Sequence, residues 1–285
     1  MERLELFQQY RSALFALSYR MLGSVTDAED MMQEAWIRWQ ATSTIVESPK
    51  AFLYRLMTRL CIDRLRHLRR EREKYIGLWL PEPLVNQQDK LETLESISYA
   101  FLVLLECLSP VERAVFILRE VFDYEYAQIA NIVNKSAVNC RQIFHRSRKR
   151  ILANQSKFNL ARQEQNLLID RFVIAWNQGD LDTLINLITE DAVFYSDGGG
   201  KVTAAVKPLQ GHIKIARFLL AIKRSNLIPD FSSQVVLVND GIGILNTVDC
   251  QPQSIFIFYF SDRKIETIFA VVNPNKLKID RLIDE

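Results

Sequence analysis

The chain has 285 residues, of which 48% are hydrophobic and 25% charged. That much apolar material excludes a largely disordered chain, and 9 Gly and 8 Pro are too few for a collagen-like one. At roughly 100–200 residues a domain, the length predicts two or three domains. The apolar runs are far shorter than the ~20 residues of a membrane span, and the charged N-terminal stretch is unlike a secretory signal. We therefore expect a cytoplasmic protein.

The charges are clustered, although the net charge is only +2. Residues 1–150 hold 22 basic and 19 acidic side chains, against 14 and 15 in the rest. Two stretches, 55–74 and 141–150, are strongly basic, and a short acidic cluster precedes them. The four cysteines and three histidines are too widely spaced for a zinc site, so we expect reduced thiols, no metal and no cofactor.

Helical spacing dominates the first half of the chain. Apolar residues recur at this spacing from Leu4 to Arg38, with a break at 23–26, where Thr26 and Glu29 predict a capping box. A further helix is expected from Lys50 towards Glu73, because Ser48 and Pro49 form a start signal. Its expected buried stripe consists of Phe52, Leu53, Leu56, Leu60 and Leu65.

A linker and a second helical part follow. The two prolines within residues 80–84 break helical geometry, so we expect an interdomain linker over 76–97. Ser109, Pro110 and Glu112 then predict a helix start. Two short helices, over about 124–133 and 137–152, flank a three-residue turn that ends in the cap Ser136, which is the helix-turn-helix pattern.

After residue 154 the pattern changes to two helices followed by strands. The helices are expected over 167–176 and 180–188. Short runs rich in Val, Ile, Phe and Tyr follow, separated by Gly, Pro, Asn and Asp, and predict strands over 192–195, 234–238, 242–248, 254–260 and 264–272. This order predicts an α+β domain with a curved antiparallel sheet.

The basic helix at 137–152 has the composition of a DNA-recognition helix. Val138, Ile143 and Ile151 are expected to pack inward, which turns Asn139, Arg141, Gln142, His145, Arg146 and Lys149 outward. Arg, Asn and Gln pair with base edges in the major groove, and Arg148, Lys149 and Arg150 suit phosphates. A solvated basic surface helix is the alternative.

The second basic stretch, 55–74, interleaves arginines with Tyr54, Leu60 and His67 on one helix. Two basic helices joined by a linker suggest two contacts with one nucleic acid. The alternative is a solvated face that packs against the acidic cluster.

Residues 1–153 resemble bacterial sigma factors of the extracytoplasmic-function (ECF) group. The stretch 27–36 resembles the core-polymerase-binding helix of region 2, and 51–55 with 63–66 resembles the −10-element helix. The stretches 108–113, 126–130 and 139–142 resemble region 4, which recognises the −35 element.

This resemblance implies three sets of site residues. The polymerase-binding set is Asp27, Glu29, Asp30, Gln33, Glu34 and Trp36. The −10 set is Tyr54, Arg55, Arg59, Asp63, Arg64, Arg66, Arg69 and Arg70. The −35 set is Ser136, Asn139, Arg141, Gln142, His145, Arg146, Arg148 and Lys149.

The remaining residues resemble a SnoaL-like domain of the NTF2-like fold, which the ECF41 subgroup carries as a C-terminal extension. Three motifs of that subgroup are present, with Asn275 where an Asp is common. They are Trp79, Leu80, Pro81, Glu82, Pro83 and Leu84; Asp197, Gly198, Gly199, Gly200 and Lys201; and Asn273, Pro274, Asn275, Lys276 and Leu277. We expect them to be docking points that regulate the sigma regions.

Together these resemblances imply a multidomain protein with all-α region 2 (1–75), a linker (76–97), all-α region 4 (98–153) and an α+β cone (160–285). The implied function is transcription initiation, with core RNA polymerase (its β′ coiled coil and β flap) and promoter DNA as partners. No separate anti-sigma factor is then obligatory, and we expect a free monomer.

Two rival functions use the same sequence differently. A SnoaL-like cone can bind an apolar small molecule, or convert it with an acid or base in the pocket. The candidate acids and bases are Asp191, Asp197, His212 and Asp249, and the candidate wall residues of the pocket are Tyr195 and Trp176. A helix-turn-helix repressor is the other rival, and the acidic cluster followed by Trp36 argues against it, because a repressor needs no polymerase-binding surface.

Overall fold

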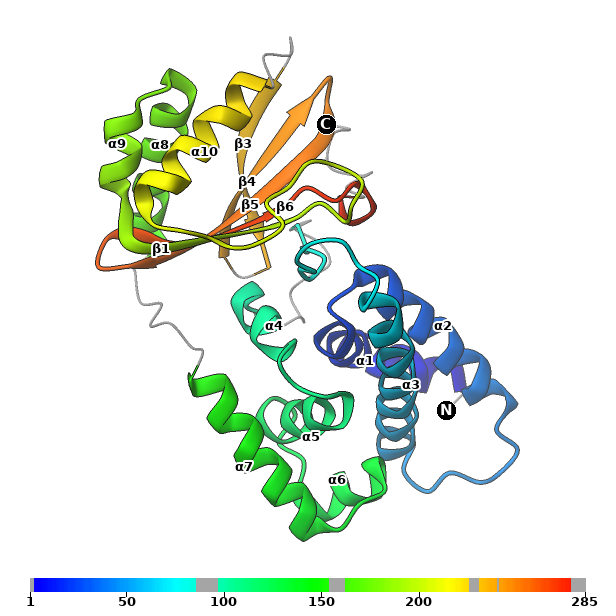
Figure 1. Cartoon of the computed structure of the whole chain (residues 1–285). Coiled ribbons are helices and arrows are strands. Elements are labelled where there is room, and N and C mark those ends of the chain that lie inside the picture. Colours follow the sequence, from blue (N-terminus) through cyan, green and yellow to red (C-terminus); the bar gives the residue numbers. More distant parts are fainter. Residues whose placement is uncertain (1–2, 86–96, 154–161, 226–230, 240, 278–285) are drawn as a thin grey trace. The chain divides into compact units, whose positions relative to one another are not determined.

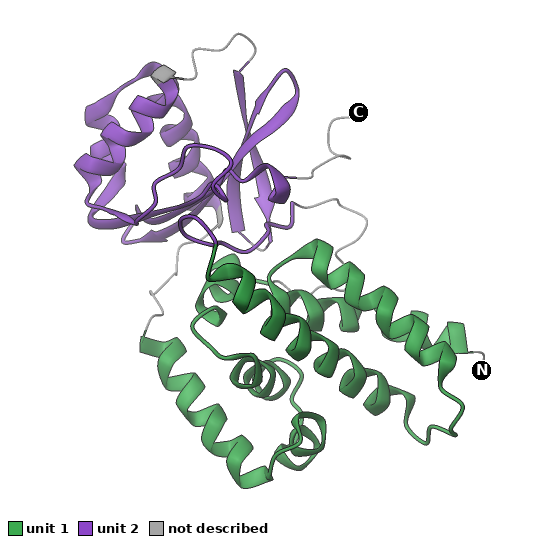
Figure 2. Ribbon diagram, turned by 45° about the vertical axis from the view of Figure 1, so that its right-hand side comes forward, with its two compact units in different colours: residues 1–74, 88–155 green, residues 75–87, 156–285 purple. Residues whose placement is uncertain are grey.

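The computed structural model describes residues 3–85, 97–153, 162–225, 231–239 and 241–277. The chain forms two compact units, Met1–Lys74 with Gln88–Gln155 and Tyr75–Gln87 with Ser156–Glu285 (Figure 2). Half of the expected linker 76–97, residues 86–96, lies outside the described residues, and the first part of the linker belongs to the second unit. Within the described ranges, no helix is both long and apolar enough to cross a membrane.

Three helices open the first unit: α1 (Arg3–Leu22), α2 (Val25–Ala41) and α3 (Pro49–Arg72) (Figure 1). Ser24 caps α2 by accepting the Asp27 amide, so the expected cap at Thr26 is wrong. Ser48 caps α3, with Pro49 in its first turn as predicted. The buried face of α3 repeats at helical spacing and is formed by Leu53, Met57, Leu60, Cys61, Leu65 and Leu68.

Four more helices complete the first unit: α4 (Tyr99–Leu105), α5 (Pro110–Glu120), α6 (Tyr126–Val133) and α7 (Ala137–Ala153). The predicted capping box of Ser109 and Glu112 is present. Asn134 ends α6 in the left-handed conformation (φ 53°), and Ser136 accepts the Asn139 amide at the start of α7. This is the predicted helix-turn-helix.

The inward face of α7 differs from the prediction at one position. Val138 is 66% exposed, whereas Cys140, Ile143, Ser147 and Ile151 are buried. The buried positions are three or four residues apart, and Val138 falls outside that stripe because it lies only two residues before Cys140, about 200° away around the helix. The outward direction of the basic side chains is unaffected.

Buried arginines join the two helical parts of the first unit. Arg113 of α5 is 3% exposed and donates to the Met21 carbonyl at the end of α1 (2.8 Å). Glu106 pairs with Arg113 (2.8 Å) and with Arg72 at the end of α3 (2.5 Å). A guanidinium with little exposure needs a compensating anion. Glu106 supplies that anion to both Arg113 and Arg72.

The second unit packs α8 (Arg162–Gln178), α9 (Leu181–Leu187) and α10 (His212–Ser225) against a six-stranded sheet (Figure 1). The strands are β1 (Ile188–Asp197), β2 (Leu209–Gln210), β3 (Phe231–Val238), β4 (Gly241–Val248), β5 (Gln251–Ser261) and β6 (Lys264–Val271), in the order β2-β1-β6-β5-β4-β3. This is the predicted SnoaL-like α+β cone with a curved sheet.

One strand pair departs from the antiparallel prediction. β1 pairs parallel with β6, from Ile188 opposite Ile265 to Asp197 opposite Val271, while the other pairs are antiparallel. The chain reaches β6 only after α10 and four intervening strands, so no hairpin turn constrains the direction of this pair.

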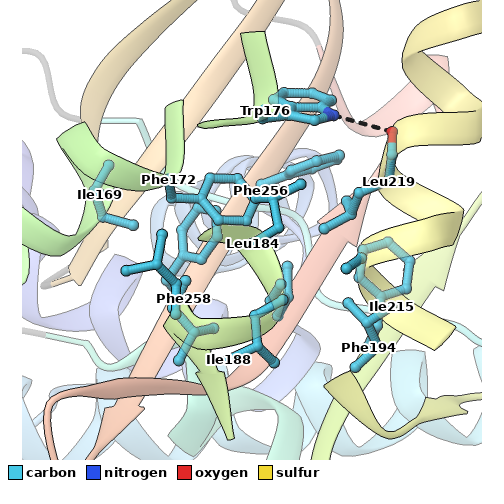
Figure 3. Packing of buried hydrophobic residues seen from close by; sticks show 14 of the residues in the cluster. Ile169, Phe172, Trp176, Leu184, Ile188, Phe194, Ile215, Leu219, Phe256 and Phe258 are labelled. Carbon is cyan, nitrogen blue, oxygen red and sulfur yellow. Dashed lines mark hydrogen bonds between the residues drawn. The ribbon is translucent and has the colours of Figure 1, made fainter. Parts of the chain in front are cut away.

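The core of the cone lies between the helices and the inner face of the sheet (Figure 3). Trp176 of α8 packs on Phe256 of β5, with ring centroids 5.4 Å apart, and its indole donates to the Leu219 carbonyl of α10 (3.0 Å). The buried indole thus ties α8 to α10.

Candidate functional site

The acidic face of α2 divides into exposed and engaged residues. Glu29, Asp30 and Gln33 are exposed. Asp27 is instead held by Arg64 of α3, whose Nε and Nη2 donate to the same carboxylate oxygen at 2.8 and 2.6 Å. Trp36 is half-buried against Phe7, with ring centroids 5.1 Å apart. Glu34 pairs with Arg38 along the helix (2.6 Å). Glu29 and Asp30 are therefore the exposed carboxylates of this surface, whereas those of Asp27 and Glu34 are engaged in ion pairs.

Tyr54, expected at the −10 DNA, is covered in the first unit. It is 4% exposed and lies 5.5 Å from the rings of both Phe122 and Tyr124, in the segment between α5 and α6. Burial raises the pKa of both tyrosines, because it disfavours the phenolate. Residues of region 4 thus cover an aromatic side chain of region 2.

Two arginines of the −10 set also contact region 4. Arg59 donates to the carbonyls of Ile132 (3.0 Å) and Asn131 (3.2 Å) at the C-terminal end of α6. Such carbonyls form the negative end of the helix dipole, where a cation is stabilising. Arg69 donates to the Leu108 carbonyl (3.1 Å).

Four other residues of the −10 set are exposed on α3, while Arg64 is half-buried and bound to Asp27. Arg55, Asp63, Arg66 and Arg70 are exposed, with Arg66 paired to Asp63 (2.9 Å) and Arg55 over the Phe52 ring (5.7 Å). A basic strip of α3 is therefore accessible while Tyr54 and the Arg59 head group are engaged.

The outward face of α7 is basic and accessible. Ser136, Arg141, Gln142, His145, Arg146, Arg148 and Lys149 are exposed, and Asn139 is half-exposed. Arg141 lies over the Tyr126 ring of α6 at 5.3 Å, and Arg119 lies over the same ring at 5.2 Å. Arg150 pairs with Glu112 (3.1 Å). The structure brings the predicted −35 residues together on one face.

The three motifs attributed to the extension meet one another in the second unit, around the carboxylate of Asp197. This side chain ends β1 and is fully buried. Its Oδ1 accepts from the Tyr75 hydroxyl (2.5 Å) and the Gly199 amide (3.0 Å). Its Oδ2 accepts from the Leu80 amide (2.9 Å) and from Lys276 Nζ (2.6 Å). We call Asp197 with these four partners the linker site.

Lys276 neutralises the carboxylate and holds the linker from its other side. Its ammonium also donates to the Leu80 carbonyl and lies 4.0 Å from the centre of the Trp79 ring. A cation over an indole face gains up to about 2 kcal/mol when it is desolvated, and this side chain is only 10% exposed. Trp79 and Leu80 are therefore bound by one charged group.

The glycines of the second motif permit this close packing. At Gly199 (φ 60°) an added Cβ would lie 2.3 Å from Nδ2 of Asn273, which donates to the Tyr75 hydroxyl (2.9 Å). At Gly200 (φ 69°) it would lie 3.0 Å from Ile76. Both positions combine left-handed backbone with a close neighbour, so only glycine fits.

Sequence reasoning missed two contacts of the linker segment 75–84, that of Tyr75 with Asp197 and that of Leu84 with Asn239. Tyr75 was assigned to the end of region 2, and nothing in its local pattern indicates the carboxylate 122 residues away. Asn239 accepts the Leu84 amide (3.1 Å) and donates its own amide to the Leu84 carbonyl (2.6 Å). Asn239 lies in a turn between strands with a left-handed φ of 57°. Asn is a typical residue for such a turn, so the turn can be recognised from the sequence, but the contact of Asn239 with Leu84 cannot.

Comparison with known proteins agrees with this division of the chain. Residues 6–71 match the model of sigma-70 region 2, and residues 98–151 match that of sigma-70 region 4. The ECF RNA polymerase sigma factor SigJ of Mycobacterium tuberculosis is 33% identical over 95% of this chain and 91% of its own. The chain belongs to the ECF RNA polymerase sigma factors.

A solved structure and one further relative also resemble this ECF sigma factor. The crystal structure of M. tuberculosis SigJ superposes with a TM-score of 0.77 at 31% identity, covering 96% of this chain and 97% of that one. A probable ECF sigma factor SigI of M. tuberculosis is 32% identical over 64% of this chain and 65% of its own. The likeness to SigJ includes the extension.

The acid-base candidates of the ECF factor's extension do not converge. A cavity of about 790 Å³ opens in the cone, lined in part by Trp176 and Phe194. None of the described residues Asp191, Asp197, His212 and Asp249 lines it. Asp191 and Asp249 are exposed, His212 begins α10, and Tyr195 stacks on Phe269 (5.2 Å). Asp197 serves the linker instead.

The glycine loop offers a controlled test of the packing around Asn273. We expect Gly199→Ala to lower the free energy of unfolding of the second unit by about 2 kcal/mol more than Gly179→Ala. Both positions have a left-handed φ, but a Cβ at Gly179 has nothing within 4 Å. Chemical denaturation followed by tryptophan fluorescence measures the difference. Equal losses in the two variants would contradict the close contact with Asn273.

Proposed function

We propose that this ECF sigma factor binds core RNA polymerase through α2, binds promoter DNA through α3 and α7, and is regulated by its extension through the linker site. The observation that carries the proposal is the coexistence, in one sigma-factor chain, of accessible basic faces on α3 and α7 with a linker anchored on a buried carboxylate of the extension.

Polymerase binding is assigned to the exposed charge of α2. Glu29 and Asp30 lie on one side of the helix beside Gln33, close to the half-buried Trp36. Acidic residues beside an aromatic side chain suit a basic, coiled-coil partner, as in the β′ coiled coil that the resemblance implies. Asp27 has a structural task in this surface, because its ion pair with Arg64 fixes α2 on α3.

Promoter binding is assigned to two basic faces. Arg141, Gln142 and Asn139 open the α7 face and suit base edges of the −35 element, while Arg146, Arg148 and Lys149 suit phosphates. On α3, Arg55, Arg66 and Arg70 are accessible to the −10 DNA. Tyr54 would support an unstacked base only after Phe122 and Tyr124 move away.

The compact first unit therefore represents a resting form in this proposal. Release of Tyr54 and Arg59 requires separation of α3 from α6, which breaks the two carbonyl contacts of Arg59. The extension acts by biasing that equilibrium, because the linker leaves α3 after Lys74 and is held at Asp197 from Tyr75 onward. In this proposal a separate anti-sigma factor is not obligatory. The free protein is a monomer and is located in the cytoplasm.

Catalysis by the cone is not part of this proposal. The four acid-base candidates of the sequence lie outside the cavity lining. Asp197, the most buried of them, already has four hydrogen-bond partners.

Polymerase binding is tested with charge-removing variants of α2. We expect the double variant Glu29→Ala with Asp30→Ala to weaken core binding about tenfold and to lower run-off transcription at limiting sigma factor, because both lost charges are exposed. Glu47→Ala, which removes an exposed acid outside α2, is the control and is expected to act like the unchanged chain. Wild-type output from the double variant would contradict the assignment.

Regulation is tested in the same run-off assay by comparing the full chain with a chain that ends at residue 153. We expect outputs that differ about fivefold or more over a titration of sigma factor, because coupling energies of this kind are 1–3 kcal/mol. In the full chain, Lys276→Met should shift output in the same direction, whereas Lys264→Met, at an exposed lysine of the same unit, should not. Identical titration curves would exclude a regulatory extension.

A further inference from the structure

The cavity of the cone has the dimensions and walls of a small-molecule site. Its volume of about 790 Å³ falls within the range of ligand pockets, roughly 300–1,000 Å³. Five aromatic side chains line it, namely Trp176, Phe194, Phe218, Phe231 and Phe256. Figure 3 shows Trp176, Phe194 and Phe256 among the buried side chains, so the deep wall is rigid core. Aromatic walls of this kind favour a flat ring system over a flexible chain.

Two polar side chains of the lining indicate which polar groups the ligand carries besides its rings. Lys223 Nζ donates to the carbonyls of Trp176 (3.0 Å) and Asn177, and its described contacts include no carboxylate. Because no carboxylate of the described residues pairs with this ammonium, an anionic group would be attracted to it. Ser254, 8% exposed, accepts from Asn246 (2.9 Å), which leaves its hydroxyl proton to donate to a ligand oxygen.

The cavity and the linker site share two wall segments. Val202 and Ala204 line the cavity and also pack against Gly198, where an added Cβ would meet the Val202 carbonyl at 2.5 Å and Ala204 at 2.8 Å. On the other side, Val272 lines the cavity while its amide donates to the Asp197 carbonyl (2.9 Å). Pro274 and Leu277 also line it and flank Lys276 in sequence. A shift of either segment moves residues of the linker site.

We propose that this cavity binds a flat, ring-containing molecule with one acidic group, and that its occupancy is coupled to the docking of residues 75–84 at Asp197. The ring system packs beside Phe218 and Phe231, the half-buried aromatic side chains of the lining. The acidic group faces Lys223, and the wall segments 202–204 and 272–277 transmit occupancy to the linker. By reciprocity, docking of the linker changes the affinity of the cavity by the same factor.

A matched pair of fluorescent probes tests the ligand class on the full chain. The two probes, 1-anilinonaphthalene-8-sulfonate and N-phenyl-1-naphthylamine, share their rings, but only the first carries an anion. We expect single-site binding of the sulfonate, weakened about tenfold in Lys223→Met, with the neutral probe changed less than twofold. Lys214→Met, at an exposed lysine of α10 outside the cavity lining, is the control and should change neither.

Three results would overturn the ligand assignment. They are no binding of the sulfonate, binding at many sites, and equal effects of Lys223→Met and Lys214→Met. Unfolding curves of the variants check that each chain is folded during the measurement. None of these results depends on transcription, so failure here is distinct from failure of the proposed sigma-factor function.

Hydrogen exchange tests the coupling. With saturating sulfonate probe, we expect exchange in residues 75–84 to change about threefold or more, while exchange in α9, away from both shared segments, stays unchanged. Trp79→Ala should change the probe dissociation constant by a similar factor. Unchanged exchange in 75–84 with the probe bound would overturn the coupling, even where binding itself is confirmed.

Discussion

The second unit depends on one buried ion pair. Asp197 is fully buried, and a carboxylate in that position is costly unless a cation and hydrogen-bond donors surround it. Lys276 supplies the cation, and Tyr75 and Leu80 supply two of the remaining three donors. Because half of its partners belong to the linker, undocking would leave the carboxylate incompletely compensated. The linker is therefore a structural part of the extension, although it lies between the two sigma regions in sequence.

A second set of contacts holds the sigma regions together in the first unit. Arg59 binds the C-terminal carbonyls of α6, Tyr54 is covered by Phe122 and Tyr124, and Arg113 joins α5 to the end of α1. The first two are residues that the DNA-binding proposal needs free. In the proposed equilibrium the same side chains serve both forms, because each is either engaged within the first unit or available to DNA.

Local chemistry made much of the fold predictable. Ser48 with Pro49 and Ser109 with Glu112 marked helix starts that are present, and the helix-turn-helix followed from Ser136 and the spacing of Ile143 and Ile151. The strands were recognisable from β-branched and aromatic runs. Local chemistry cannot show pairing between distant segments, so the parallel β1–β6 pair was not foreseen, and Val138 was placed inward from its hydrophobicity alone.

The site was predictable to the level of motifs but not of contacts. Resemblance indicated Asp197 to Lys201 and Asn273 to Leu277 as docking motifs, but only the folded structure shows that they meet around one carboxylate. Tyr75 carries no sequence signal, because its role depends on a partner 122 residues away. Asn275, which stands where an Asp is common in the subgroup, still accepts from Lys201 (2.8 Å). A hydrogen bond from the charged ammonium to a neutral amide oxygen stands there in place of an exposed ion pair, which is of small energetic value.

The most direct test of the central claim is hydrogen exchange of the linker in Asp197→Asn, measured on the full chain. The substitution keeps the shape of the side chain and removes the charge that Lys276 pairs with. We predict that exchange in residues 75–84 accelerates about tenfold or more, with α9 unchanged, because each lost charge-assisted contact is worth about 1.5–3 kcal/mol. Asp191→Asn, at an exposed position of the same strand, should leave the linker as protected as in the unchanged chain. Equal protection of residues 75–84 in both variants would contradict the account.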